Sequence, residues 1–528
     1  MFQTAQPALR ATQLGAARRW LALTALMFPV LLIAVDNTVL AFALPAISLA
    51  LQPGGTEQLW IVDVYALVLA GLLVPMGSIG DRFGRRRMLL IGATGFAVVS
   101  AAAAFATNAG QLIAGRALIG VFGSMIMPAT LSLIRNIFAD ATERRLAIAI
   151  WAAAYSGGAA LGPLVGGALL EHFAWGSVFL LAVPALVPLL VLAPVLVPES
   201  RDPAPSPVDP TSILLVVAAA TAVVFGIKEL AHDGGAPAAL VLAVGLLAGL
   251  AFVRRQLRRQ RPMLDVRLFR TPAFSAGLAS NLLSIFSLVG FMLFLSQHLQ
   301  LVAGESPLNA GLLMLPGLAL TIATGLAAVR LAARFSARAV MVAGLVLNAA
   351  GYGLVLAFGR DGSLPALLTG FAVVGAGVGL AETLSNDLII ASVPPAKAGA
   401  ASAISETAYE LGAVLGTAIL GSVLGAAYRL NVVVPDGLTG EGAARARETL
   451  GGAVDAAHLL PGPAASQLLA SARHAFDSGV GVTAAIGAVL MLGAAAVVRR
   501  ALGQPKGPGN ATAHPREVTL GQRRTRGR

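Results

Sequence analysis

Several ionisable side chains stand inside stretches of the sequence that are otherwise apolar. A charge in such surroundings is costly unless it is paired or lines a water-filled cavity, so each of these residues marks a possible functional site. Buried carboxylates can exchange protons or bind cations, and an arginine beside them can hold a counter-charge. The candidates for proton coupling or cation recognition are therefore Asp36, Asp63, Arg116, Glu382, Asp387, Glu406 and Glu410.

Two of these acids are four residues apart, so Glu406 and Glu410 share one face of a helix. Two carboxylates that close in an apolar setting cannot both stay ionised cheaply, so one of them should take up and release a proton near neutral pH. Simpler interpretations stay open for other members of the set. Asp63 and Asp387, and also Asp36 and Glu406, could lie at helix ends among lipid headgroups. Arg116 could only hold two helices together through an acid.

Glycines recur at four-residue spacing at positions 158, 162 and 166. Gly158, Gly162 and Gly166 form one bare helix face that lets another helix approach closely, and Gly167 extends the run. Pro163 cannot donate a backbone hydrogen bond and should bend the helix there. The pattern suits a helix that packs tightly in one conformation and shifts in another, although many membrane helices carry such glycines for packing alone.

A basic loop with an acid between two glycines follows the second apolar stretch. Membrane topology explains the excess of arginine in a cytoplasmic loop, but it does not explain the acid. We expect Asp81 to pair with a cation or a helix N-terminus across the cytoplasmic mouth in one conformation only. The candidate gating residues are Gly77, Gly80, Asp81, Arg82, Gly84, Arg85 and Arg86.

Aromatic side chains near these acids could stack against an organic cation. Ordinary packing is the more frequent role of such residues in an apolar chain. The candidates are Tyr65, Trp151, Tyr155, Phe286 and Tyr409.

The composition is that of a membrane protein. Of 528 residues, 57% are hydrophobic and 12% are charged, and the mean hydropathy is +0.81, whereas soluble chains have about 25% charged residues. There is no Cys, the six His form no metal-spaced pair, and no phosphate-binding loop surrounds any lysine. These features argue against an enzyme, an ATP-driven transporter and any bound cofactor or metal. In this apolar background the net charge of +12 indicates membrane topology rather than nucleic-acid binding.

Apolar runs of membrane-spanning length predict an all-α membrane protein with 14 transmembrane helices. An even number of spans places both termini on one side, and most of the 37 basic residues then fall on that side, which makes it cytoplasmic. We therefore expect a multi-pass protein of the bacterial inner membrane that works as a monomer in the lipid bilayer. The predicted spans are 19–44, 58–79, 88–107, 110–133, 146–169, 177–197, 211–231, 237–253, 273–296, 308–329, 339–358, 364–392, 399–424 and 479–498.

The chain contains a weak internal repeat. The loop segment 79–86 aligns with 331–338, eight predicted helices later, which indicates two six-helix bundles separated by an inserted helix pair. The second copy has Ala333 and Ser336 where the first has an acid and a glycine. The predicted segments are an N-terminus 1–18, a first bundle 19–198, inserted helices 199–272, a second bundle 273–498 and a basic tail 499–528. Within the second bundle, 428–478 is too polar to span and should form an extracellular insertion with helical runs at 441–450 and 464–476.

These segments resemble the 14-helix drug:proton antiporter branch of the major facilitator superfamily. Loop 77–86 is similar to the family's signature between helices 2 and 3, 162–167 to its antiporter signature in helix 5, and 35–45 to the branch's helix 1 motif. Segments 60–71, 125–135 and 405–416 look most like those of quaternary-ammonium exporters. One departure is Ile119, where the family often has Gln before the helix 4 glycine.

The resemblance implies two six-helix bundles with pseudo-two-fold symmetry, and multidrug efflux driven by the proton motive force. It assigns proton coupling or cation recognition to Asp36, Glu406 and Glu410, an acidic position to Asp63 and proton transfer to Arg116. The expected partners are protons and small organic, mainly cationic, molecules. Export of an endogenous antibiotic or metabolite is an alternative; a passive facilitator fits the intramembrane acids less well.

Overall fold

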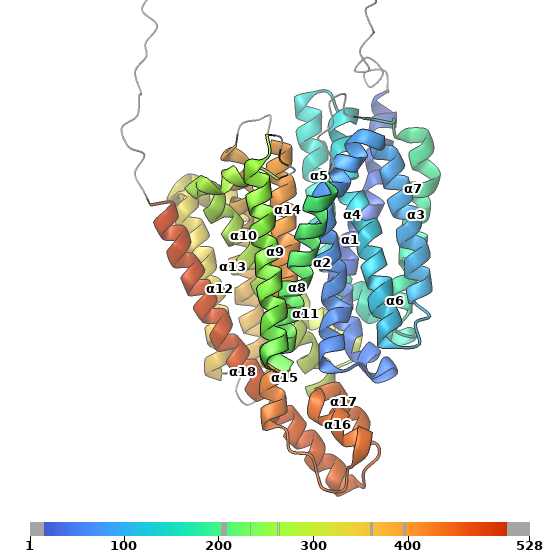
Figure 1. Ribbon diagram of the computed structural model, residues 1–528, viewed down its shortest axis with the longest axis vertical. Helices are drawn as coiled ribbons and strands as arrows, with labels where there is room; N and C mark the ends of the chain where they lie inside the picture. The colour runs from blue at the N-terminus through green and yellow to red at the C-terminus, as the bar shows by residue number, and fades with distance from the viewer. Residues whose placement is uncertain are drawn as a thin grey trace, which may run out of the picture.

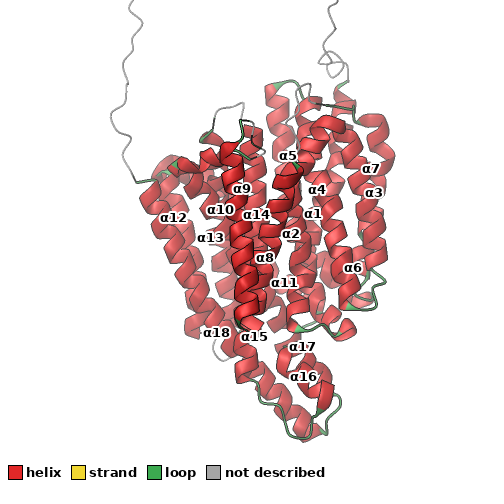
Figure 2. Cartoon of the chain, viewed as in Figure 1, coloured by secondary structure: helices red, strands yellow, loops and turns green. Residues whose placement is uncertain are grey.

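The structure is a computed structural model of an all-helical protein (Figure 2). It describes residues 15–201, 209–232, 234–260, 262, 264–358, 363–393 and 398–503, and within them there is no β-strand. Fourteen helices in this part of the chain are long and apolar enough to cross a membrane, as the sequence predicts. Most of the predicted N-terminal segment 1–18 and of the tail 499–528 lies outside the described residues.

The first group of helices, which we call the N bundle, has a continuous apolar core. In it α1 packs against α5 and α7, and α4 packs against α2 and α3. Its helices are α1 (Ala16–Leu51), α2 (Gly55–Phe83), α3 (Arg85–Ala103), α4 (Ala109–Ile137), α5 (Ala141–His172), α6 (Ser177–Leu180) and α7 (Ala182–Leu196).

Two helices follow as a hairpin, α8 (Pro210–His232) and α9 (Ala236–Arg258), which pack along each other. Asp209, directly before α8, accepts hydrogen bonds from Ser212 and from Arg255 of α9. The Arg255 guanidinium holds the pKa of the Asp209 carboxyl well below its usual range. On its other sides α8 contacts α2 and α15, so the inserted hairpin lies against both bundles.

The second group, which we call the C bundle, has its own apolar core. In it α13 packs against α10, α11 and α12, and α18 packs against α12 and α15. A short η3 (Val266–Arg270) leads into it and η4 (His298–Val302) extends α10. The other elements are α10 (Pro272–Gln297), α11 (Pro307–Phe335), α12 (Ala337–Phe358), α13 (Leu364–Ala391), α14 (Ala398–Leu415), η6 (Gly416–Leu420), α15 (Gly421–Asn431) and α18 (Gly462–Ala501).

The internal repeat is visible in the backbone. Gly84, between α2 and α3, has φ +120°, and Ser336, between α11 and α12, has φ +80°. These are equivalent positions of the two loop copies. A side chain is strained in this region, where glycine is not, so the turn persists in the second copy even though its glycine has been replaced.

The two ends of the molecule differ (Figure 1). We call the end where α1 begins and α18 finishes the terminal face, and the opposite end, which carries α16 (Gly440–Glu448) and α17 (Leu450–Ala457), the hairpin face. One expectation is corrected here: the helical run 464–476 and the last span are not separate. They form one helix of 40 residues, α18, because no glycine-proline break or charged run interrupts the chain between them.

Candidate functional site

The first candidate acid is tied to the candidate arginine. Asp36 lies in α1 and Arg116 in α4, and Arg116 Nη1 is 2.8 Å from Asp36 Oδ2. Both side chains are buried. The guanidinium also lies 4.4 Å from the centre of the Tyr65 ring of α2 and donates to the carbonyl oxygen of Ile61. Asp36 therefore has a permanent counter-charge, because arginine stays protonated in proteins.

The second candidate acid is also paired, with a residue that the sequence analysis did not single out. Lys228 Nζ of α8 lies 3.0 Å from Asp63 Oδ2 of α2, and the two side chains are 0% and 2% exposed. The ammonium is 4.2 Å from the centre of the Trp60 ring. Asp63 is thus buried in protein rather than placed among headgroups. Lys228 could have been recognised from the sequence, because it is one of only three lysines and stands in the predicted span 211–231.

The C bundle contributes three glutamates whose surroundings differ from those of Asp36 and Asp63. Glu410 of α14 is buried, whereas Glu406 of α14 and Glu382 of α13 are partly buried and close enough for their charges to interact. Asn37 Nδ2 lies 3.5 Å from Glu410 Oε1 and 3.3 Å from Tyr155 Oη, so the N bundle reaches Glu410 directly. None of the three forms an ion pair with a basic side chain in the part of the chain that the structure describes.

Three of the candidate aromatic residues lie together beside these glutamates. Trp151 and Tyr155 of α5 are stacked, with ring centres 6.3 Å apart, and Tyr155 meets Tyr409 of α14 edge to face at 5.9 Å. The row therefore crosses from the N bundle to the C bundle. The other two candidates lie elsewhere: Tyr65 is buried beneath Arg116, and Phe286 belongs to the core of the C bundle.

Asp387 differs from the other candidate acids. Its side chain is exposed, and it lies five residues after Glu382, near the C-terminal end of α13. The structure does not bring it into a described contact with the other acids. The helix-end interpretation therefore fits Asp387 better than a role in the interior.

The glycine stripe of α5 is covered by α1. A Cβ atom on Gly158 would lie 2.8 Å from the carbonyl oxygen of Leu31, one on Gly166 would lie 2.6 Å from Val39, and one on Gly162 would overlap Thr38. Larger side chains would therefore force the two helices apart.

The end of the same motif faces the other bundle. A Cβ atom on Gly167 would lie 2.6 Å from the backbone of Leu308 in α11, and one on Gly311 would lie 2.6 Å from the carbonyl oxygen of Pro163. Backbone therefore meets backbone where α5 crosses α11. The motif lies at the boundary between the bundles, where small residues permit a close contact that other side chains would block.

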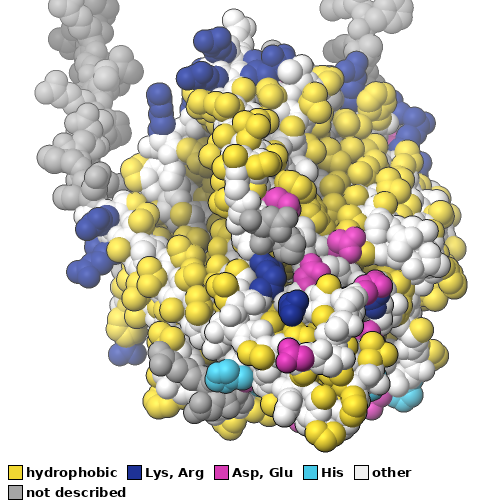
Figure 3. Space-filling model, turned by 60° about the horizontal axis from the view of Figure 1, so that its bottom comes forward, with side chains coloured by type: hydrophobic (Ala, Val, Ile, Leu, Met, Phe, Trp, Pro, Cys, Tyr) yellow, Lys and Arg dark blue, Asp and Glu magenta, His cyan; other side chains and the backbone are white. Residues whose placement is uncertain are grey.

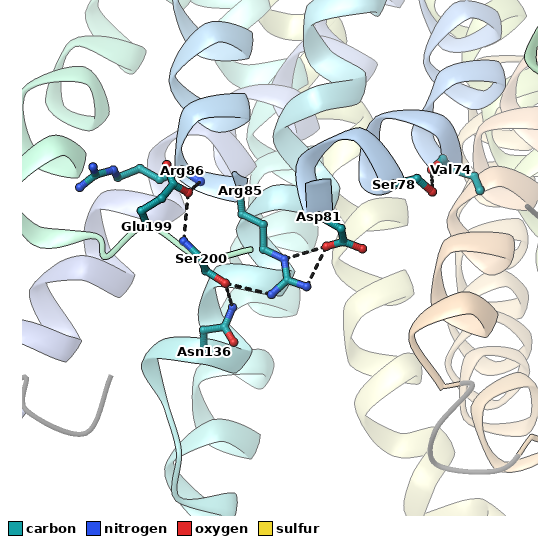
Figure 4. Close-up of polar contacts among 8 residues, drawn as sticks. All are labelled: Val74, Ser78, Asp81, Arg85, Arg86, Asn136, Glu199 and Ser200. Carbon is teal, nitrogen blue, oxygen red and sulfur yellow. Dashed lines mark hydrogen bonds and ion pairs between the residues drawn. The ribbon is translucent and has the colours of Figure 1, made fainter. Parts of the chain in front are cut away.

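The loop between α2 and α3 is held within the N bundle (Figure 4). Arg85 Nη2 lies 2.7 Å from Asp81 Oδ1, and Arg85 Nη1 donates to Ser200 Oγ at 3.1 Å. Asn136 of α4 donates to the same hydroxyl at 2.5 Å. In this conformation Asp81 therefore pairs inside its own loop. A partner across the mouth of the molecule is not seen in this conformation, because Arg85, directly after the turn at Gly84, pairs with the acid.

A second set of contacts fixes the loop to the end of α7 and the segment after it. Glu199 accepts from the backbone N–H of Arg86, and Arg86 Nη1 donates to the carbonyl oxygens of Pro194 and Val197. Gly84 leaves room for Glu199, since a Cβ there would lie 2.8 Å from its carboxylate. Gly77 and Gly80 pack near Pro128 and Met88, and Arg82 is exposed. Glu199 and Ser200 were not predicted as part of this site, because they lie more than a hundred residues from the loop in the sequence.

On the hairpin face, several hydrogen bonds join the two bundles. Ser296 of α10 donates to the carbonyl oxygen of Ala41, and Gln300 of η4 donates to that of Phe42. Glu448 of α16 accepts from the backbone N–H of Gly55 at 2.8 Å. These contacts hold the bundles together at this end of the molecule.

Comparison with known proteins gives the family. The Major Facilitator Superfamily model matches residues 26–417. The multidrug efflux pump LfrA of Mycolicibacterium smegmatis is 59% identical over 91% of this chain and 96% of its own length. The methyl viologen resistance protein SmvA of Salmonella typhimurium is 40% identical over 87% of this chain and 93% of its own.

A solved structure has the same architecture. A bacterial homologue of the human lysosomal transporter Spinster, in an inward-facing and unoccupied conformation, covers 92% of this chain and 99% of its own with a TM-score of 0.65 and 18% identity. That likeness concerns the fold alone. Fourteen apolar helices, the repeated loop and these matches together show that the chain belongs to the major facilitator superfamily of multi-pass membrane transporters.

Proposed function

We propose that this protein is a proton-coupled antiporter that exports amphipathic organic cations across the bacterial inner membrane. The names of LfrA and SmvA support drug export as the activity. The observation that carries the proposal is a group of glutamates beside an aromatic row at the boundary of the two bundles. These are Glu382, Glu406 and Glu410, none of which has a basic partner among the described residues. Asp36 and Asp63, by contrast, already have cations.

Exchange follows from the charge balance of this site. A carboxylate without a cation, buried in a membrane protein, is stable only when a proton or another cation neutralises it. A cationic molecule that stacks on Tyr155 and Tyr409 and pairs with Glu406 or Glu410 would therefore displace a proton. Each proton that returns down a potential of 100 mV supplies about 2.3 kcal/mol, which can drive the cargo outward.

The contact of Asn37 with Glu410 gives a means of coupling charge to conformation. It is a hydrogen bond between α1 of one bundle and α14 of the other. Its strength depends on whether Glu410 is ionised, because a donor binds a carboxylate more strongly than a carboxylic acid. Protonation of Glu410 would then weaken a link between the bundles.

The charge distribution supports an orientation with both termini in the cytoplasm. Acidic side chains gather on the hairpin face, and many Lys and Arg side chains lie towards the terminal face (Figure 3). Positive charge marks the cytoplasmic side of bacterial membrane proteins. The chain has no Cys, so single cysteines at Arg258 and Asp436 can be labelled in intact cells with a membrane-impermeant thiol reagent. Labelling at 436 and not at 258 is expected; the reverse pattern would refute the orientation.

The exchange itself can be measured on purified protein in weakly buffered detergent solution. Adding a monovalent quaternary-ammonium compound should release protons, and Glu406→Gln or Glu410→Gln should reduce the release at least tenfold while the protein still purifies as a monomer. Glu171→Gln is the matched control, because Glu171 is an exposed acid at the end of α5. Unchanged proton release in both glutamate variants would refute the assignment of the site.

A further inference from the structure

The pair of Asp63 and Lys228 has the composition of a cation-binding site. The ammonium lies 3.0 Å from the Asp63 carboxylate and over the Trp60 ring, 4.2 Å from its centre. Phe225 of α8 packs against Trp60, with ring centres 6.2 Å apart. Acids combined with aromatic faces are the groups with which proteins recognise organic ammonium ions. In this site the cation is the ammonium of Lys228, which belongs to the protein itself.

The ammonium of Lys228 depends on these two groups. Its side chain is fully buried, and Nζ forms no hydrogen bond with any group in the described residues besides its ion pair with Asp63. A buried ammonium carries three donors and is costly when they are unsatisfied. Stability alone therefore does not explain a lysine at position 228. An apolar residue there, with Asn in place of Asp63, would avoid the cost of burying the two charges.

Three parts of the molecule meet at this pair. Asp63 belongs to the N bundle and Lys228 to the inserted hairpin, and η6 of the C bundle, which carries Thr417 beside Asp63, contacts both α2 and α8. Lys228 also lines a pocket together with Gln58, Ser422 and Glu448, the last of which belongs to α16 on the hairpin face. The pair therefore lies between the glutamate site and the side on which exported cargo would leave.

The distance between Asp63 and the glutamate site is comparable to the separation of the two charges in a dicationic cargo molecule. Thr417 follows Glu410 by seven residues, which corresponds to about 10 Å along a helix. A flexible molecule with two cationic ends could span such a distance. If Asp63 were free, it would attract the second cationic end while the first occupied the glutamates.

We propose that Lys228 is a specificity-determining residue, an internal cation that fills the site formed by Asp63 and Trp60 and so denies it to the second charge of a dication. This inference rests on the proposed export of organic cations. The wild-type protein then gains nothing from a second positive charge on its cargo. Loss of the lysine charge opens Asp63 and favours dications.

The test compares two series of compounds on purified protein at pH 8, where an acid without a partner is more fully ionised. One series has a single trimethylammonium group on an alkyl chain; the other has a trimethylammonium group at each end, with linkers of increasing length. For the wild type, the affinities for the two series should agree within about threefold at every linker length. For Lys228→Met, the dication should bind at least tenfold more tightly than the monocation, with an optimum linker length.

Two further variants separate specificity from folding. Lys228→Arg keeps the charge and should keep the wild-type ratio, and Asp63→Asn combined with Lys228→Met removes both charges and should also lack the dication preference. A wild type that already prefers dications tenfold with a length optimum would overturn the inference without any variant. So would a folded Lys228→Met protein with an unchanged ratio. Monocation binding that persists in either case would leave the proposed function standing, whereas no binding of either series to the wild type would overturn both.

Discussion

Neutralising one member of the pair of Asp36 and Arg116 should destabilise the protein far more than neutralising both. The charges are 2.8 Å apart, and the side chains of Arg116 and Asp36 are only 2% and 9% exposed. At an effective dielectric constant of 20 their attraction is about 6 kcal/mol, most of which offsets the cost of removing them from water. Arg116→Met alone leaves a buried carboxylate without a partner, so we expect a loss of about 3–5 kcal/mol in the free energy of unfolding.

The double variant Asp36→Asn with Arg116→Met removes the unpaired charge and should recover to within about 1 kcal/mol of the parent. Denaturant unfolding of purified protein in detergent, followed by tryptophan fluorescence, measures all four members of this cycle. An exposed pair provides the control: Glu441→Gln, which breaks the contact with Arg445 on α16, should cost at most about 1 kcal/mol. Additive effects of the two single changes would show that the buried pair is not coupled and would refute the reasoning.

The recovered double variant also decides between the two roles considered for Arg116. If the pair only holds α1 and α4 together, the double variant should release protons in response to cargo as the parent does. We expect that it does not, because the guanidinium also lies over the ring of Tyr65, which is close to both Asp36 and Glu410. Normal proton release in a stable double variant would assign the pair a structural role.

Three further outcomes are expected. Gly162→Val should abolish export, because the valine side chain would overlap α1. The control Gly157→Ala, whose added methyl group meets open space, should export normally. Export by both variants would show that the glycine stripe is not in close contact with α1 during transport. Gly84→Ala should lower the yield of folded protein, since φ +120° strains any side chain and the glycine leaves room for a carboxylate; a normal yield in a detergent-solubility assay would contradict this. Asp209→Asn should lower the thermal stability at pH 7. The pKa of Asp209 lies below its unfolded value because of Arg255, so its contribution is present above about pH 4 and lost as the pH falls further, and the melting temperatures of variant and parent should converge in acid.

The sequence determined the helices, and with them the fold. Each span is recognisable because about 20 apolar residues in succession have no other stable place than a bilayer or a core, and this property is local. The turn at Ser336 was foreseeable from its alignment with Gly84. The shared helix face of Glu406 and Glu410 follows from helical geometry alone.

Only the tertiary structure decided which of the buried charges are balanced. Nothing local distinguishes Asp63 from Glu406, since both are acids in apolar surroundings, yet Asp63 has a lysine 165 positions away and Glu406 has no basic partner among the described residues. The same holds for Asp36, whose partner Arg116 lies 80 positions away in α4. The physical reason is one of range: the cost of burying a charge can be read from its neighbours in sequence, but the charge that offsets it comes from another helix, and packing alone brings the two together.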